Sequence, residues 1–294
     1  MTSGPLVTIL INNYNYGRFL TDAIDSALNQ TYRNLEVIVV DDGSTDDSPE
    51  IVASYGNRII SVLKENGGQA SAFNAGFAAS RGEIICLLDS DDSFDACKVE
   101  RVVPHCRPGS MLYHPLRLEP GPGVFAPHVV PRNFYRFARQ FRFVPYIGSP
   151  TSGLVIHREL ALRLMPLPTQ HVRSSADDFI VRGAGLIGEV IGIPDVLGNY
   201  RVHGENAWYG TQAPKSREFI GQLETYLNQK LVEAGKAPVI DFYRSLYAEV
   251  FVTQNPAALA RLAFSVLSHH FSFFTLKFTL RTLAQAGRRA MTSV

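Results

Sequence analysis

Short hydrophobic runs alternate with helical periodicity along the first ninety residues. Four runs rich in β-branched and aliphatic side chains predict buried strands at Val7–Ile11, Leu35–Val40, Ile59–Leu63 and Glu83–Leu88. Between them, apolar residues at helical spacing or helix-capping residues predict helices at Phe19–Leu28, Pro49–Tyr55 and Gln69–Ala79. Strands that alternate with helices are typical of a mainly parallel sheet flanked by helices. The pattern therefore predicts an α/β fold.

Polar clusters directly follow three of these predicted strands. They are Asn12–Asn15, Asp41–Ser44 and Asp89–Asp92. Ligands of open parallel sheets bind outside the carboxyl ends of the strands. We therefore expect the three clusters to converge on one edge of the sheet.

The pattern changes in the second half of the chain. Residues 103–147 are rich in proline, glycine, aromatic residues and arginine, and predict irregular or antiparallel structure over the front of the sheet. Strands are predicted at Leu154–Ile156 and Ile191–Tyr200, with a helix at Ser174–Gly188 between them. Further helices are predicted at Ser216–Ala234, Ile240–Gln254, Pro256–Ser268 and Phe273–Arg288. The chain then divides into a sheet domain, residues 1–205, and a helical accessory region, residues 206–294.

Composition narrows the class of protein. With 294 residues, 46% hydrophobic and 19% charged, the chain can bury a full core like an ordinary soluble domain. A net charge of +1 argues against a nucleic-acid-binding protein. Cys86, Cys97 and Cys106 have no metal-ligand spacing and favour a reducing cytoplasm. We find neither a signal peptide nor an apolar run of about 18 residues that would span a membrane.

The C-terminal region is basic. Residues 250–294 contain five lysine or arginine residues and no acidic residue, together with several phenylalanines. Basic amphipathic helices at 256–290 could lie peripherally on the cytoplasmic face of a membrane. Alternatively, their apolar stripe packs on the rest of the chain or on a second subunit of a homodimer.

The sequence Asp89-Ser90-Asp91-Asp92 places three carboxylates within four residues. Such like charges repel, so the cluster needs a cation or a polar ligand. Oxygen ligands at this spacing suit Mg²⁺ or Mn²⁺ shared with phosphate oxygens. An alternative is that Ser90, Asp92 or Ser93 caps the next helix.

Fragments between Val7 and Asp92 resemble, in order and spacing, the family-2 glycosyltransferases. The matching fragments are Val7–Asn15, Ser26–Tyr32, Glu36–Asp46, Asn66–Gln69, Asn74–Gly76, Arg81–Glu83 and Asp89–Asp92, with weaker similarity as far as His203. The resemblance implies a GT-A (Rossmann-like) fold and an inverting enzyme that uses a nucleoside-diphosphate-sugar. The Gln-x-x-Arg-Trp motif of processive relatives is absent, so we expect transfer of one sugar or a few.

The resemblance also implies a nucleotide site. Asn12 and Tyr14 would lie under the base, and Asp42 would accept a hydrogen bond from a pyrimidine N–H, which favours a UDP- or dTDP-sugar. Gly68 and Gln69 precede a helix whose N-terminal amides could face the donor. The alternatives are purely structural roles, an Asp-Gly turn at Asp42 and a simple turn at Gly68.

By the same resemblance, the acidic cluster corresponds to a DxD motif. We assign Asp91 and Asp92 as ligands of a divalent metal, Mn²⁺ or Mg²⁺. His203 would be an additional ligand, although a lone histidine is more often structural. Asp89, together with Asp91, would hold the nucleotide through its ribose and diphosphate.

Inversion requires a general base that removes a proton from the acceptor hydroxyl. Asp178 matches this base in the resemblance, and Asp177 stands where many relatives carry glutamate. The alternative is that both carboxylates cap a helix and interact with its dipole.

Two functions from different classes follow. The first is a metal-dependent inverting glycosyltransferase in the cytoplasm that acts on a hydroxyl of a glycan or a lipid-linked acceptor. The second is a non-catalytic relative that binds a nucleotide-sugar or a glycan, which the departure at Asp177 leaves open. A Rossmann oxidoreductase is disfavoured because Asn12–Asn15 replaces the Gly-x-Gly-x-x-Gly turn after the first strand.

Overall fold

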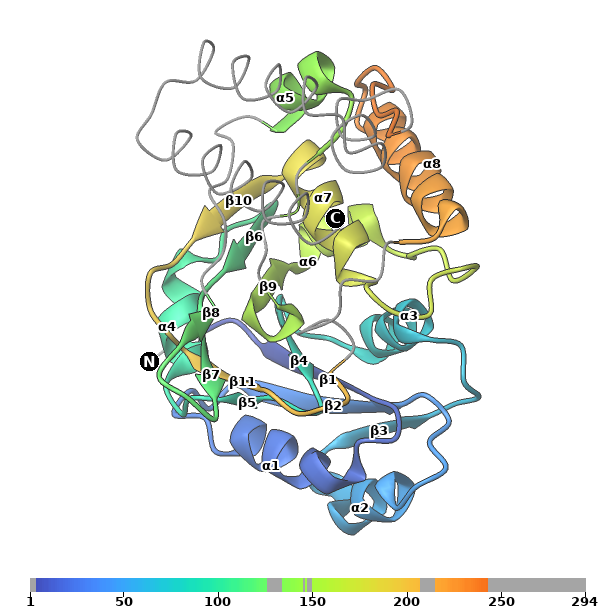
Figure 1. Cartoon of the computed structure of the whole chain (residues 1–294). Helices are drawn as coiled ribbons and strands as arrows, with labels where there is room; N and C mark the ends of the chain where they lie inside the picture. The colour runs from blue at the N-terminus through green and yellow to red at the C-terminus, as the bar shows by residue number, and fades with distance from the viewer. Residues whose placement is uncertain (1–3, 126–133, 145, 147–149, 207–214, 243–294) are drawn as a thin grey trace.

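The computed structural model describes residues 4–125, 134–144, 146, 150–206 and 215–242 (Figure 1). Its main sheet has seven strands in the order β10-β6-β9-β4-β1-β2-β3. Their bounds are β1 Val7–Asn13, β2 Leu35–Asp41, β3 Ile60–Leu63, β4 Ile84–Asp89, β6 Ser110–Tyr113, β9 Leu154–His157 and β10 Glu189–Gly192. Only β9 runs antiparallel to its neighbours β4 and β6. The expected α/β fold with a mainly parallel sheet is confirmed.

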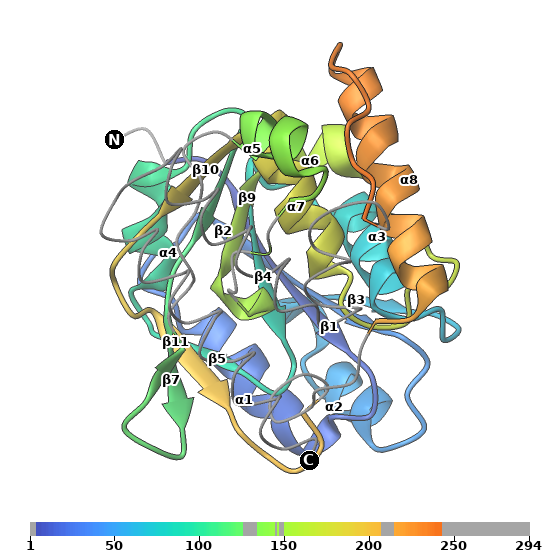
Figure 2. The same ribbon diagram turned by 45° about the horizontal axis from the view of Figure 1, so that its top comes forward.

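Helices cover both faces of this sheet (Figures 1 and 2). The first four are α1 Gly17–Leu28, α2 Ser48–Ser54, α3 Gln69–Ala79 and α4 Lys98–Val102. The others are α5 Phe134–Phe141, α6 Arg158–Leu164, α7 Asp177–Ile187 and α8 Arg217–Glu233. Alternate residues of β1 enter opposite cores, since Leu10 packs with α3 and α7 while Ile9 and Ile11 pack with α1.

The first four predicted strands and three predicted helices are present close to their expected bounds. Strands β1, β2 and β4 continue into the polar clusters, ending at Asn13, Asp41 and Asp89. Register pairs Asn12 with Asp89 and Asn13 with Asp41 across the sheet. Polar side chains of neighbouring strands are therefore held side by side at one edge.

Residues 103–147 depart from the expected irregular or antiparallel structure. Strand β6 belongs to the main sheet and pairs in parallel with β10, and α5 is a helix. The antiparallel expectation holds for the pairing of β6 with β9, and for the pairing of β7 Leu116–Glu119 with β8 Val124–Phe125. Strands β7 and β8 lie in a second sheet ordered β5-β11-β7-β8, with β5 at Ser93–Phe94 and β11 at Gly198–Arg201. Strands as short as β6 are stabilised by partners distant in sequence, which local patterns do not reveal.

Two further differences occur later in the chain. The strand expected over Ile191–Tyr200 is divided, because β10 ends at Gly192 and β11 begins at Gly198 in the other sheet. Pro194 lies in the connection and cannot donate a ladder hydrogen bond. The short helix α6 was not predicted, because its seven residues give a weak periodic pattern.

Helix α8 packs against α7 (Figure 2) and coincides with the helix expected at Ser216–Ala234. The rings of Phe219 and Tyr226 contact the Phe179 ring edge-on at 5.4 and 5.3 Å. Residues Ile240–Phe242 are not helical, and the remainder of the helix expected at Ile240–Gln254 lies outside the described residues. The predicted helices and membrane-contact segment at 256–290 also lie outside them.

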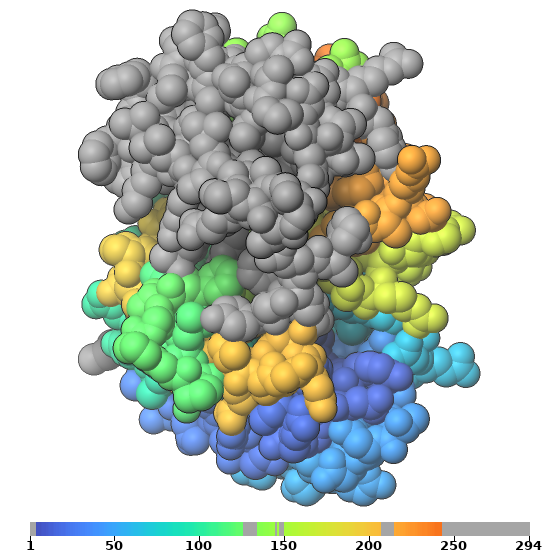
Figure 3. All heavy atoms as spheres, in the orientation of Figure 1, coloured from blue at the N-terminus to red at the C-terminus, as the bar shows by residue number. Residues whose placement is uncertain are grey.

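A space-filling view shows α1 and α2 in blue at one end of the molecule and α8 in orange at its side (Figure 3). Within the described part of the chain, no helix combines the length and hydrophobicity needed to cross a bilayer.

Candidate active site

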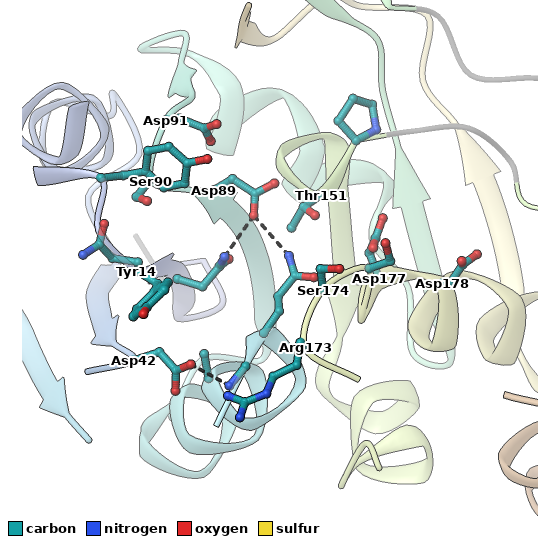
Figure 4. Close-up of a pocket in the computed structure, with 18 of the residues that line it drawn as sticks. Tyr14, Asp42, Asp89, Ser90, Asp91, Thr151, Arg173, Ser174, Asp177 and Asp178 are labelled. Atoms are coloured by element: carbon teal, nitrogen blue, oxygen red, sulfur yellow. Dashed lines mark hydrogen bonds between the residues drawn. The ribbon is translucent and has the colours of Figure 1, made fainter. Parts of the chain in front are cut away.

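A cavity of about 700 Å³ lies at the carboxyl ends of β1, β2 and β4. All three polar clusters contribute to its wall, as the sequence predicted. Residues from the start of α3, from the loop 173–175 and from the start of α7 complete it. Figure 4 shows Tyr14 and Asp42 on one side, Asp89 and Asp91 in the middle, and Asp177 and Asp178 on the far side.

Asp42 is held tightly at the end of β2. It is only 3% exposed. Its carboxylate accepts hydrogen bonds from the amides of Gly67 (3.0 Å) and Gly68 (2.6 Å) and pairs with Lys64 Nζ at 2.5 Å. The amides of Gly67 and Gly68, just before α3, therefore bind Asp42. Lys64 was missed in the sequence, although it directly follows the third predicted strand.

Position 68 requires glycine because of its backbone conformation and because Arg173 lies close to it. Its φ is +85°, and a Cβ there would lie 2.7 Å from Arg173 Cα. Any larger residue would push the loop that carries Arg173 out of the cavity wall. Tyr14, by contrast, is 46% exposed and forms an aromatic wall of the cavity.

Asp89 joins three elements at the centre of the cavity. Its Oδ1 accepts a hydrogen bond from Asn12 Nδ2 at 3.0 Å and a longer one from Gln69 Nε2 at 3.5 Å. Gln69 Oε1 also accepts the amide of Ala176 at 2.9 Å. The predicted nucleotide-site residues Asn12, Gln69 and Asp89 therefore form one network that reaches the start of α7.

The three carboxylates of the acidic cluster have oxygens within 4.8 Å of one another. Burial, followed by the charge of Asp91, raises the pKa of Asp89 to about 7. The same two causes raise the pKa of Asp92 well above its ordinary value. Oxygen donors that repel one another when no cation is bound fit a hard divalent metal.

The predicted metal ligands differ in their surroundings. Asp91 lines the cavity, and its Oδ2 lies 3.0 Å from His203 Nε2. Asp92 is 1% exposed, and its two oxygens accept hydrogen bonds from the Ser152 hydroxyl (2.6 Å) and the Arg201 amide (3.0 Å). His203 packs its ring against Phe19, with centroids 4.9 Å apart. Asp91 therefore lines the cavity and is paired with His203, whereas neither His203 nor Asp92 is among the residues that line the cavity.

The capping alternative for the acidic cluster is wrong. Helix α4 begins at Lys98, after Cys97, and has no side-chain cap. Ser90, Asp92 and Ser93 therefore do not cap the next helix.

Sequence reasoning missed a buried cation below the cluster. Lys98 is fully buried, donates to the Ser152 carbonyl at 3.1 Å, and lies 3.2 Å from the centroid of the Phe94 ring. Burial lowers its pKa to about 7, and the nearby carboxylate of Asp92 partly opposes this effect. Lysine is almost never fully buried, so the residue type gave no indication of this position.

Asp177 and Asp178 begin α7 but do not cap it through their side chains. The N-cap residue is Ala176, which makes no side-chain cap hydrogen bond, and both carboxylates lie in the first turn, where the helix dipole favours them. The Tyr146 hydroxyl donates to Asp177 Oδ2. Asp178 pairs with Arg182 at 2.9 Å and with Lys215 at 3.2 Å.

Known proteins resemble this chain in sequence and in fold. The model of the family "Glycosyl transferase family 2" matches residues 8–147. An uncharacterized glycosyltransferase of Nostoc sp. is 30% identical over 257 residues, which cover 82% of this chain and 80% of the relative. An uncharacterized glycosyltransferase of Rickettsia typhi is 46% identical over 102 residues, or 35% of this chain and 32% of that protein. The chain thus spans about a third of the Rickettsia protein.

A solved structure shares the fold. Residues 1–349 of TarS of S. aureus, in complex with UDP-GlcNAc, match with a TM-score of 0.58 and 16% identity, covering 90% of this chain and 81% of that one. This likeness supports the GT-A fold of the sheet and its helices. The family match and the Nostoc relative together show that the chain belongs to glycosyltransferase family 2.

Proposed function

We propose that this glycosyltransferase is a divalent-metal-dependent, inverting enzyme that moves one sugar from a UDP- or dTDP-sugar to an acceptor hydroxyl. The observation that carries the proposal is the acidic cluster Asp89, Asp91 and Asp92, whose carboxylate oxygens gather within 4.8 Å. Asp89 and Asp91 line one cavity together with Asp42 and the first-turn carboxylates of α7, which supports the proposal.

The nucleotide would lie against Tyr14 and Asp42. The exposed Tyr14 ring offers a stacking surface for a base. Asp42 is fixed by two amides and Lys64, so its carboxylate would accept a base N–H without first having to be ordered. A hydrogen-bond acceptor at this point favours uracil or thymine, each of which presents a ring N–H.

The diphosphate would lie beside Asp89, Asp91 and His203. A bound Mn²⁺ or Mg²⁺ would neutralise charge on the departing nucleoside diphosphate. Asp91, which lines the cavity and pairs with His203, is our choice as the principal carboxylate ligand. Asp92 would be the second carboxylate ligand of the metal. Hydrogen bonds from the Ser152 hydroxyl and the Arg201 amide hold its side chain in place.

The acceptor would enter beside the start of α7. A carboxylate there would remove the proton of the attacking hydroxyl, while the hydroxyl oxygen bonds to the anomeric carbon on the face opposite the leaving diphosphate. The bond from the anomeric carbon to the diphosphate oxygen breaks, and the nucleotide departs with its electron pair. We expect the acceptor hydroxyl to belong to a glycan or a lipid-linked glycan.

The proposal is tested by calorimetric titration of UDP, dTDP and GDP into the purified protein, with Mn²⁺ and with EDTA. We expect UDP or dTDP to bind only with Mn²⁺, and Asp91→Ala to abolish that binding. Asp195→Ala is the matched control, because its carboxylate pairs with Arg101 on the surface and does not line the cavity.

Three outcomes would contradict the proposal. Tight GDP binding with no UDP or dTDP binding would show that the donor class is wrong. Equal nucleotide binding in EDTA and Mn²⁺ would show that the acidic cluster is not a metal site. Binding without release of sugar from any UDP- or dTDP-sugar would favour the non-catalytic relative.

A further inference from the structure

We propose that Ser152 is a positioning residue of the acidic cluster, and that the buried Lys98 holds Ser152 in place. This inference rests on the proposed function, in which the cluster binds a divalent metal. Neither Ser152 nor Lys98 is among the residues that line the cavity. Both would therefore act on the metal through the carboxylates of the cluster.

The Ser152 hydroxyl joins the two ends of the acidic cluster. It accepts a hydrogen bond from the backbone amide of Asp89 at 3.0 Å and donates one to Asp92 Oδ2 at 2.6 Å. Ser152 is fully buried, so water does not compete for these bonds. A hydroxyl has a single proton to donate, and here that proton is used on Asp92. One side chain thus fixes the end of β4 and the orientation of the Asp92 carboxylate together.

Ser152 belongs to the short helical turn Thr151–Gly153, which immediately precedes β9. Its neighbour Thr151 lines the cavity and lies next to Asp89 (Figure 4). The turn therefore contributes one side chain to the cavity wall and one to the support of the cluster. A displacement of this turn would disturb the spacing of Asp89 and Asp92.

Lys98, in α4, is the group that holds this turn. Its Nζ donates a hydrogen bond to the Ser152 carbonyl at 3.1 Å and lies 3.2 Å from the centroid of the Phe94 ring. The lysine ion pairs found in the described part of the chain involve Lys64, Lys215 and Lys230, but not Lys98.

Burial of the Lys98 amino group is costly, because no carboxylate of the described residues compensates it. A methionine would fill nearly the same space without that cost. Stability therefore does not account for a lysine at this position. The hydrogen bond to the Ser152 carbonyl is the contact that a methionine could not make.

The amino group of Lys98 could affect a bound cation in two opposite ways. Its hydrogen bond fixes the turn, which favours metal binding, whereas its positive charge would repel the metal. Burial lowers the pKa of Lys98 to about 7. Measurements at about pH 8 therefore keep the repulsion small, while the neutral amine still donates its hydrogen bond.

The test is a calorimetric titration of Mn²⁺ into the full chain in the presence of saturating UDP, or of dTDP if that is the nucleotide that the wild type binds. Ser152→Ala should raise the Kd for Mn²⁺ by about 10- to 100-fold, the range found when residues that orient metal ligands are removed. Lys98→Met should raise it in the same direction by a smaller factor, because Lys98 acts through Ser152.

The chain offers a matched control for each variant. Ser110 is also fully buried, and its hydroxyl bonds to the backbone of Arg107 at 2.9 and 2.7 Å, away from the cavity. Lys230 is 7% exposed and pairs with Glu233 at 2.9 Å. Ser110→Ala and Lys230→Met should lower Tm and leave the Kd for Mn²⁺ unchanged.

Thermal unfolding without metal separates positioning from stability. The Tm of Lys98→Met should stay the same or rise, because an apolar side chain replaces a buried amino group that has no carboxylate partner. Its weaker Mn²⁺ binding would then occur in a protein that is no less stable. A lower Tm with an unchanged Kd for Mn²⁺ would show that Lys98 has only a structural role.

The outcomes distinguish this inference from the proposed function. If the wild type binds Mn²⁺ and nucleotide, and Ser152→Ala binds them equally well, the inference is wrong and the proposed function stands. If the wild type shows no metal-dependent nucleotide binding, the proposed function itself is refuted. If Ser152→Ala does not fold, Lys98→Met decides, and unchanged or tighter Mn²⁺ binding in that variant overturns the inference.

Discussion

At the residue scale, the role of each carboxylate in this cavity depends on what binds it. Asp42 is bound by two backbone amides and a lysine, Asp177 by a neutral hydroxyl, and Asp178 by two cations. All three are aspartates, and two are adjacent in sequence. Their partners come from other parts of the chain, such as Lys215 for Asp178. The residue types predicted an acidic site, but only the folded surroundings give each carboxylate its own set of partners.

Metal binding should depend on pH through Asp89. Its pKa in the fold is raised to about 7, above the ordinary value of about 4. Its charge therefore opposes folding increasingly as pH rises from about 4 to about 7, and a cation relieves that cost. We expect saturating Mn²⁺ to raise Tm more at about pH 7.5 than at about pH 5.5, because protons compete with the metal. Differential scanning calorimetry measures the shift.

The control for this prediction is Asp91→Ala, which should lose the Mn²⁺ effect at both pH values. An equal rise in Tm at the two pH values would show that Asp89 does not titrate with the metal site.

At the scale of the element, helix α3 packs closely against the main sheet. Its observed bounds, Gln69–Ala79, equal those expected from the sequence. The helix lies on β1 and β2, and Gly76 is the point of closest approach. A Cβ at Gly76 would lie 2.1 Å from Leu10 Cδ1 and 2.9 Å from Val40 Cγ2.

Gly76→Ala should therefore destabilise the protein by about 1–3 kcal/mol, since overpacking outweighs the gain in helix propensity. Gly221→Ala in α8 is the matched control, because no described atom lies within 4 Å of its added Cβ. There the substitution should stabilise by about 0.5–1 kcal/mol through helix propensity alone. Urea unfolding of both variants tests the contrast, and equal stability changes of one sign would refute it.

Two elements that the sequence pattern did not predict, β6 and α5, are stabilised by partners that are distant in sequence. Strand β6 has four residues and is completed by β9 and β10, which follow more than forty residues later. Helix α5 lies in a stretch whose prolines and glycines suggested a loop. In both cases burial against elements remote in sequence outweighs weak local preference.

At the scale of the whole molecule, α8 is packed into the main core. Leu223, Tyr226 and Leu227 are buried in the same cluster as α7, and the Tyr226 hydroxyl donates to the Leu164 carbonyl at 2.7 Å. Lys215, just before α8, also pairs with Asp178. The domain boundary expected after residue 205 remains a prediction. Because α8 packs into the core of the sheet domain, removing it tests that boundary.

A chain that ends at residue 205 should not unfold cooperatively. Each large side chain that α8 buries contributes about 1.5–3 kcal/mol, and a domain has only about 5–15 kcal/mol in total. Circular dichroism on heating measures the transition. The full chain with Tyr226→Phe is the control and should lose about 1 kcal/mol, the value of one hydrogen bond. A sharp transition of the truncated chain would show that residues 1–205 fold alone.

The sequence by itself determined the alternation of strands and helices, the polar clusters at the ends of β1, β2 and β4, and the family to which they point. These features depend on local periodicity and on the rule that parallel strands bring their carboxyl ends to one edge. The tertiary structure decided which groups meet across that edge: Lys98 beneath the acidic cluster, the glycine amides on Asp42, and Tyr146 on Asp177. Charge and hydrogen bonding in a buried site depend on distance in space, which spacing along the chain does not fix.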